Sequence, residues 1–180
     1  MPRGDSSALQ IREASLELFF RHGVSGTSLR MVAESLGVTK AAIYHHYRTK
    51  DDIVRAVLDP AFTTFTTLVE RVDALPPDEQ VMALVRGLAR QAVVHRRLYA
   101  VTLHDVTAAE LRRGSAQEQT FRRMRDLLAG PASDRGSVAR SALFLSGLMA
   151  PAVDADLLAM DGAELEAAII EAGARLLGRD

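Results

Sequence analysis

The sequence predicts an all-α protein, and three observations support this fold class. Apolar residues recur at three- and four-residue spacing along most of the chain, as amphipathic helices require. Strand-like alternation is nearly absent, and aromatic residues make up only 5% of the 180 residues. Glycine and proline stand mainly between the periodic segments, where they separate one helix from the next. We therefore expect roughly nine helices.

Two helices are predicted in the N-terminal part of the chain. The first begins at Ser6 and stops at Gly23, because its apolar residues keep one face and glycine accommodates the backbone that ends a helix. The second is short. Its N-cap is Thr27 or Ser28, whose hydroxyl can accept a backbone N–H, and Gly37 ends it.

A third helix is capped by Thr39 and runs to about Tyr47. A fourth begins at Thr49, where Thr-Lys-Asp-Asp combines a cap with acidic residues that favour a helix N-terminus. This helix meets Asp59 and Pro60. Because proline inside a helix costs about 3 kcal/mol, either the helix kinks there or a new helix begins with Asp59 as its cap.

Five further helices are expected after the break at Pro76 and Pro77. They span residues 78–94, 95–106, 116–129, 133–150 and 162–177. Ser115 and Glu118 suit a capping box at the third of these, and Gly178 suits the end of the last.

The composition excludes several functional classes. The chain has no cysteine, which removes disulfides and thiolate metal sites. No apolar run reaches the ~20 residues that span a bilayer, and the first residues have no apolar signal core, so we expect a cytoplasmic location and no membrane partner. No nucleophile–base set, phosphate loop or metal-ligand cluster is visible, so we expect no enzyme activity, no cofactor and no metal.

Positive charge is concentrated near the N-terminus, although the net charge is −1. Between Arg21 and Lys50 there are five basic residues and one acidic residue, Glu34. The two lysines of the chain, Lys40 and Lys50, both lie in this part. A local basic density of this kind indicates a polyanionic partner.

The second and third predicted helices, joined by Gly37 and Val38, match a helix-turn-helix whose second helix enters the DNA major groove. Lys40 is the candidate for a hydrogen bond to guanine, and the small side chains that follow it suit close approach to thymine methyls. Lys50 combines its charge with a helix N-terminus, which suits a phosphate. The predicted DNA contacts are Thr27, Ser28, Arg30, Thr39, Lys40, Ala41, Ala42, Tyr44, His45, His46 and Lys50.

Residues 11–58, IREASLELFFRHGVSGTSLRMVAESLGVTKAAIYHHYRTKDDIVRAVL, resemble the N-terminal domain of the tetracycline-repressor-like (TetR/AcrR) family of bacterial transcriptional regulators. The motifs that carry the resemblance are Phe19, Gly23, Thr27-Ser28, Val32-Ala33, Gly37-Val38-Thr39 and Tyr44-His45-His46-Tyr47-Arg48-Thr49-Lys50. Tyr47 replaces the usual phenylalanine, and Ala42 stands where glycine or a small polar residue is common.

The resemblance implies a helix-turn-helix domain, residues 1–50, and a helical ligand-binding and dimerisation domain, residues 51–180. It implies a homodimer on a palindromic double-stranded DNA operator and a small-molecule effector, for which the aliphatic and phenyl side chains favour an apolar or amphipathic compound. The pocket candidates are Phe62, Phe65, Gln91, His95, Tyr99, His104, Phe121, Met124 and Phe144. The dimer-interface candidates are Ala142, Leu145, Ser146, Met149, Leu165, Ile169, Ala172 and Leu176.

A repressor that releases its operator on binding ligand, with Asp59-Pro60 as a pivot, is the function we expect. The alternative is a helical adaptor for protein partners with vestigial DNA binding. His45 and His46 do not suggest a metal site, because adjacent helical residues diverge by roughly 100°. The arginines of Arg122-Arg123-Met124-Arg125 are expected to form a solvated helix face.

Overall fold

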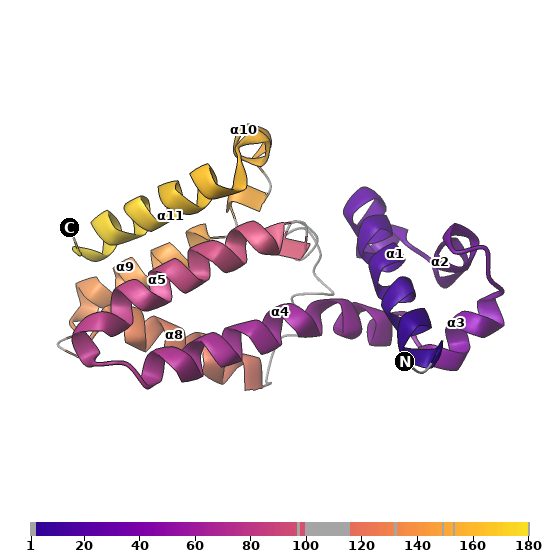
Figure 1. The fold of residues 1–180 in the computed structure, drawn as a ribbon, viewed down its shortest axis with the longest axis horizontal. Helices are drawn as coiled ribbons and strands as arrows, with labels where there is room; N and C mark the ends of the chain where they lie inside the picture. The colour runs from indigo at the N-terminus through magenta and orange to yellow at the C-terminus, as the bar shows by residue number, and fades with distance from the viewer. Residues whose placement is uncertain are drawn as a thin grey trace. The chain divides into compact units, whose positions relative to one another are not determined.

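The protein is described here by a computed structural model covering residues 3–96, 98–99, 116–131, 133–148, 150–152 and 154–179. Within these residues the secondary structure consists of nine α-helices and one short 3₁₀ helix, with no strand (Figure 1). The predicted all-α fold class is confirmed. The chain divides into two compact units, the first reaching to Pro60 and the second made of residues 61–99 and the described part of 112–180.

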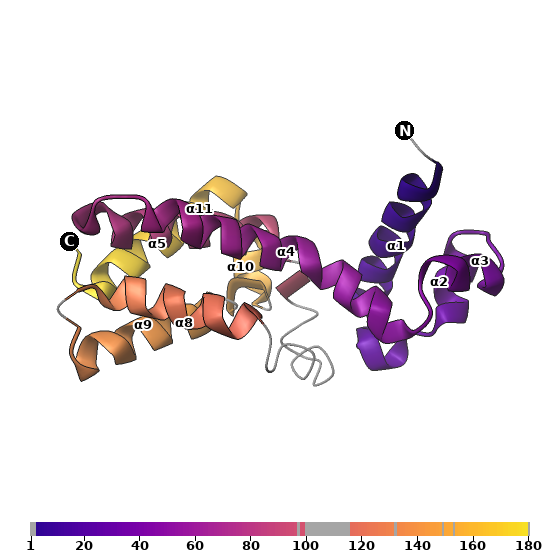
Figure 2. The same cartoon turned by 90° about the horizontal axis from the view of Figure 1, so that it is seen from below.

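The first unit contains α1 (Arg3–Gly26), α2 (Leu29–Ser35), α3 (Lys40–His46) and the beginning of α4 (Lys50–Asp73). Helix α2 packs on both α1 and α3 (Figure 2). The buried apolar side chains of this unit are Ile11, Phe19, Val24, Val32, Ala33, Ile43, Ile53, Val54, Val57 and Leu58. Burial of each large side chain contributes roughly 1.5–3 kcal/mol, so this small core fixes the orientation of the short helices.

Two glycines shape the first unit. Gly23 has φ 72° and ψ 162°, which breaks the helical backbone inside α1. Gly37 has φ 65° in the turn between α2 and α3, and no described atom lies within 4 Å of the place a Cβ would take. Glycine is needed at Gly37 because the backbone is left-handed, and not because a neighbour crowds it.

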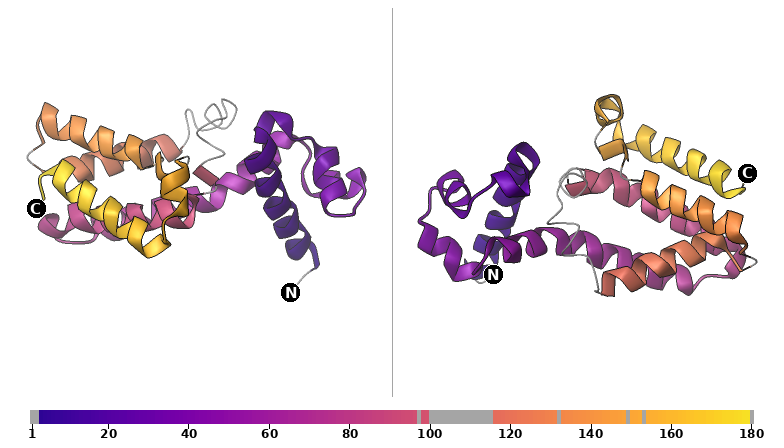
Figure 3. Two further views of the ribbon diagram at one scale, coloured as in Figure 1. Left: turned by 90° about the horizontal axis from the view of Figure 1, so that it is seen from above. Right: turned by 180° about the vertical axis from the view of Figure 1, so that it is seen from behind.

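The second unit contains the rest of α4, then α5 (Pro77–Val94), α8 (Ala116–Ala129), α9 (Arg135–Gly147), η1 (Ala150–Ala152), α10 (Ala155–Ala159) and α11 (Gly162–Leu177). Helix α5 lies beside α11 and α8, and α9 lies beside α8 and α11 (Figure 3). Leu84, Val85, Leu88, Met124 and Leu165 are among its most deeply buried side chains. The core of this unit therefore lies between α5, α8, α9 and α11.

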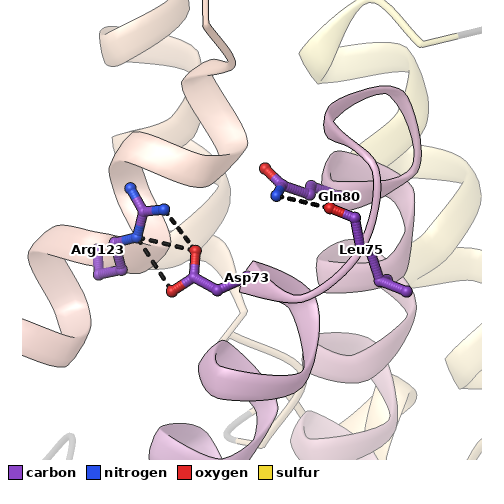
Figure 4. A network of polar contacts seen from close by, with 4 residues as sticks. All are labelled: Asp73, Leu75, Gln80 and Arg123. Carbon is purple, nitrogen blue, oxygen red and sulfur yellow. Dashed lines mark hydrogen bonds and ion pairs between the residues drawn. The ribbon is translucent and has the colours of Figure 1, made fainter.

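A polar bridge joins α8 to the end of α4 (Figure 4). The Arg123 guanidinium donates from Nε to both carboxylate oxygens of Asp73, at 3.1 and 3.3 Å, and from Nη2 to Oδ1. In the next turn the Gln80 amide donates to the carbonyl of Leu75 at 3.0 Å. The first contact links α8 to the end of α4, and the second lies within the α4–α5 connection itself.

The helix boundaries confirm several predictions and correct others. Helices α8 and α11 have the predicted bounds, and α5 begins one residue early. Helix α9 is shorter than the predicted 133–150 because Asp134 caps it, accepting the Ser137 N–H at 2.7 Å, and because the residue before Pro151 disfavours the α conformation. The connection that follows contains η1 and α10, which were not predicted.

Two further boundaries concern the N-terminal half. Helix α1 continues to Gly26 beyond the break at Gly23. Helix α4 is continuous through Pro60, so no new helix begins with Asp59 as its cap. Most of the predicted helix 95–106 and the predicted cap at Ser115 lie outside the described residues.

Candidate nucleic-acid interface

Side-chain caps fix the two short helices of the first unit. The Ser28 hydroxyl accepts the N–H of Met31 at 3.2 Å and begins α2. The Thr39 hydroxyl accepts the N–H of Ala42 at 3.2 Å and begins α3. Ile43 is completely buried and holds α3 on the core. A cap at its first residue and an anchor in its middle therefore set the orientation of α3.

The opposite side of α3 is exposed. Lys40, Ala41, Tyr44 and His45 are all exposed, and the Lys40 ammonium lies 5.4 Å from the centre of the Tyr44 ring. This places a positive charge over the ring face, a cation–π contact that orients both side chains. The side combines a basic group, a phenol hydroxyl and the small methyl of Ala41. These groups suit contact with base edges and phosphates.

Ala42 and His46 lie on another side of α3, one helical turn apart. They line a hollow of about 380 Å³ together with Gln10, Glu13 and Ala14 of α1. His46 is half-buried, and its ring meets that of His45 edge to face at 5.3 Å. Ala42 is exposed like Lys40 and Ala41, but it differs from them in lining this hollow beside α1.

The predicted DNA contacts around the start of α2 also differ in their exposure. Ser28 and Arg30 are exposed, and the Arg30 Nε lies 2.7 Å from the Glu34 carboxylate. Thr27 is only 2% exposed, and its hydroxyl donates to the carbonyls of Gly23 at 2.8 Å and Leu18 at 3.2 Å. This burial corrects the prediction for Thr27, because a hydroxyl bonded inside the domain does not face DNA.

Lys50 is half-buried at the first position of α4. Its ammonium donates to the carbonyls of Val24 at 3.0 Å and Thr27 at 3.2 Å. Val24 lies in the last turn of α1, beyond the break at Gly23, and Thr27 lies in the connection between α1 and α2. Sequence reasoning missed these bonds, because the two carbonyls lie more than twenty residues before the lysine.

The first unit is similar in sequence to known bacterial regulators. Residues 11–57 match the model of the bacterial regulatory proteins, tetR family. The HTH-type transcriptional regulator TtgR of Pseudomonas putida is 44% identical over 55 residues, which cover 31% of this chain and 26% of TtgR. The regulator SrpR of the same species is 29% identical over 132 residues, covering 57% of this chain and 62% of SrpR. The matched parts thus span less than two thirds of either relative.

The crystal structure of AmtR from Mycobacterium smegmatis extends the likeness to both units. It superposes with a TM-score of 0.76 at 27% identity, over 94% of this chain and 85% of AmtR. Residues 11–57 are thus similar to the tetR family of bacterial regulatory proteins, and the fold of the chain is similar to that of AmtR.

The second unit encloses a small cavity where the pocket was expected. Its volume is about 20 Å³, room for about one water molecule. The residues that line it are Phe65, Leu88, Ala92, Tyr99, Phe121, Met124, Leu145 and Leu148. The Phe65 ring is 6.1 Å from that of Tyr99 and 5.9 Å from that of Phe121. Four predicted pocket residues are therefore brought together.

The other pocket candidates lie elsewhere. Phe62 and Gln91 do not line the cavity, and Phe144 is buried against Gly173. His95 meets the edge of Tyr99 at 6.3 Å, and burial lowers the pKa of its imidazole. Burial likewise raises the pKa of the Tyr99 phenol. His104 lies outside the described residues.

The predicted dimer-interface residues divide between surface and interior. Ala142 and Ser146 of α9 and Ala172 and Leu176 of α11 are exposed, and Ile169 is half-buried. Leu165 is 2% exposed and belongs to the core. Leu145 lines the cavity, and Met149 lies outside the described residues. Leu143, beside Ala142, is 63% exposed.

The arginines of residues 122–125 form ion pairs within the protein. Arg122 pairs with Glu118, Arg123 with Asp73, and Arg125 with Asp126 at 3.1 Å. Met124 between them is buried, so the run does not form a continuous basic patch. Among the described residues no cluster of three potential metal ligands occurs, and no helix there is long and apolar enough to cross a membrane.

Proposed function

We propose that this chain is a ligand-responsive, DNA-binding transcription regulator that works as a homodimer. The observation that carries the proposal is the exposed side of α3, where Lys40, Ala41, Tyr44 and His45 are exposed on a helix that Thr39 caps and Ile43 anchors. A short helix held this way presents a thin, basic face to a major groove. The similarity to TtgR and SrpR, both HTH-type transcriptional regulators, supports the same assignment.

A second copy of the chain would supply the second recognition helix. Exposed small and apolar residues follow α9 at helical spacing (Ala139, Ala142, Leu143 and Ser146). Ala168, Ala172 and Leu176 do the same on α11. Two helices with such faces, meeting their copies, form a four-helix interface. Two half-sites about 34–36 Å apart then form a palindromic operator.

The effector is proposed to enter the second unit at the cavity between α4, α5, α8 and α9. The lining is apolar and aromatic, which favours an apolar or amphipathic compound. A cavity of about 20 Å³ must widen to accept one, so ligand binding has to move the lining helices. Helix α4 has residues in both units, with Pro60 at the division, and is the proposed route by which the operator is released.

Selection of bound sequences from a random DNA pool, at near-physiological salt, tests the proposal. A palindromic motif with two half-sites about one helical turn apart, or somewhat more, is the expected result. Log affinity for that motif should fall steeply with log salt concentration. If no motif is enriched and retention on DNA is independent of salt, the proposal is wrong and the adaptor alternative takes its place.

A further inference from the structure

We propose that Lys50 is a positioning residue, which holds the turn between α1 and α2 in place for DNA binding and makes no contact with a phosphate. The inference rests on the proposed function and deepens it. Its basis is the pair of hydrogen bonds from the Lys50 ammonium to the carbonyls of Val24 and Thr27.

The two carbonyls need a donor from outside the turn. Helix α1 ends at Gly26, so the carbonyls at its end lose the regular i+4 N–H partners that a continuing helix would supply. The Val24 carbonyl accepts the Thr27 N–H at 3.2 Å and has a second lone pair, which the lysine uses. A cation is favourable here, because the carbonyl end of a helix carries partial negative charge.

The lysine itself is held by its own helix. Thr49 and Asp52 form reciprocal cap bonds: the Thr49 N–H donates to the Asp52 carboxylate at 2.9 Å, and the Asp52 N–H to the Thr49 hydroxyl at 3.1 Å. This fixes the first turn of α4, from which Lys50 extends. The lysine therefore links a rigid helix start to a turn that would otherwise be fixed mainly by Val24 and Thr27.

The turn matters for DNA because α2 begins immediately after it. Thr27 is followed by Ser28, the N-cap of α2, and Arg30 lies in the first turn. A displacement of Thr27 would move both exposed residues and, through α2, the helix α3 that packs on it. Lys50 thus acts on DNA through the position of α2.

The two lysines of the chain provide a matched pair for the test. Lys50→Met removes the donor and keeps most of the side-chain volume, and Lys40→Met removes the exposed lysine of α3. Thermal unfolding, amide hydrogen exchange of residues 27–31 and the salt dependence of binding to the selected operator are measured for both full-length variants and the parent.

For Lys50→Met we expect the melting temperature to fall by roughly 3–8 °C, exchange at residues 27–31 to accelerate, and the slope of log affinity against log salt to stay unchanged. For Lys40→Met we expect weaker binding with unchanged melting. A slope reduced by about 0.9 per half-site in Lys50→Met would show a lost phosphate contact and overturn the proposal. Unchanged melting and exchange in that variant would overturn it as well.

A measurement on the parent protein covers the case in which Lys50→Met does not fold. With ¹⁵N-labelled lysine, an ammonium held by two carbonyls exchanges slowly and gives a signal, which should persist in Lys40→Met. Absence of that signal would refute the positioning role. Thermal melting, amide exchange and the ammonium signal are all measured without DNA. If the chain binds no operator, the proposed function is wrong, and these three measurements still decide whether Lys50 holds the turn.

Discussion

Adding a methyl group at Gly173 tests how closely α11 packs against α9 and α5. A Cβ at this position would lie 2.6 Å from Cε2 and 3.0 Å from Cζ of Phe144, and 3.1 Å from Cγ1 of Val85. Carbon atoms pack best at about 3.5–4.0 Å, so both side chains must move. Phe144 is 6% exposed and Val85 is completely buried, which leaves them little room.

The expected cost follows from two opposing terms. Overpacking of a core costs about 1–3 kcal/mol, and alanine gains up to about 1 kcal/mol over glycine inside a helix. We therefore expect Gly173→Ala to lower the free energy of unfolding by about 1 kcal/mol, and by no more than about 2 kcal/mol. In a chain of this size that lowers the melting temperature by roughly 2–8 °C.

Gly147→Ala is the matched control, because no described atom lies within 4 Å of the place its Cβ would take. We expect this variant to be as stable as the parent or slightly more stable. Urea denaturation at one fixed protein concentration measures both, with the midpoint compared at equal slope. If Gly173→Ala proves as stable as Gly147→Ala, the close approach of α11 to Phe144 is wrong.

Three further predictions concern the second unit. Burial lowers the pKa of His95 below its ordinary value near 6.5, so the free energy of unfolding should be constant above that pH and fall as pH drops below it. Urea midpoints at pH 7.5 and pH 5 should therefore show a smaller loss of stability in His95→Gln than in the parent. Equal losses in the two proteins would contradict the shift. Asp134→Ala removes the carboxylate that accepts the Ser137 N–H and should cost about 0.5–2 kcal/mol in urea denaturation, an unchanged midpoint counting against the cap. A double-mutant cycle on Asp73 and Arg123, both partly exposed, should give a coupling of about 0.2–1 kcal/mol, and additive losses would mean that the bridge contributes nothing.

Local signals in the sequence were sufficient for most of the helical structure. The cap at Thr39, the turn at Gly37 and the end of the last helix at Gly178 are encoded within a few residues, because a hydroxyl cap or a left-handed glycine acts on its own helix end. The same proximity explains why the helix-turn-helix was visible without a structure. The choice between Thr27 and Ser28 as cap was not visible, because both side chains carry the same group.

Contacts between distant parts of the chain were decided only by tertiary structure. Thr27 turns inward because α1 breaks at Gly23 and offers it a carbonyl, and Lys50 reaches a turn formed more than twenty residues earlier. The periodic pattern of α11 places Leu165 on its apolar face but does not predict which helix covers that face. In the structure α11 packs against α5 and α9, and Leu165 is buried. Leu145 lines the cavity for the same reason. Helical periodicity determines which residues share a face, whereas the arrangement of the other helices determines whether that face meets the core, a cavity or the surface.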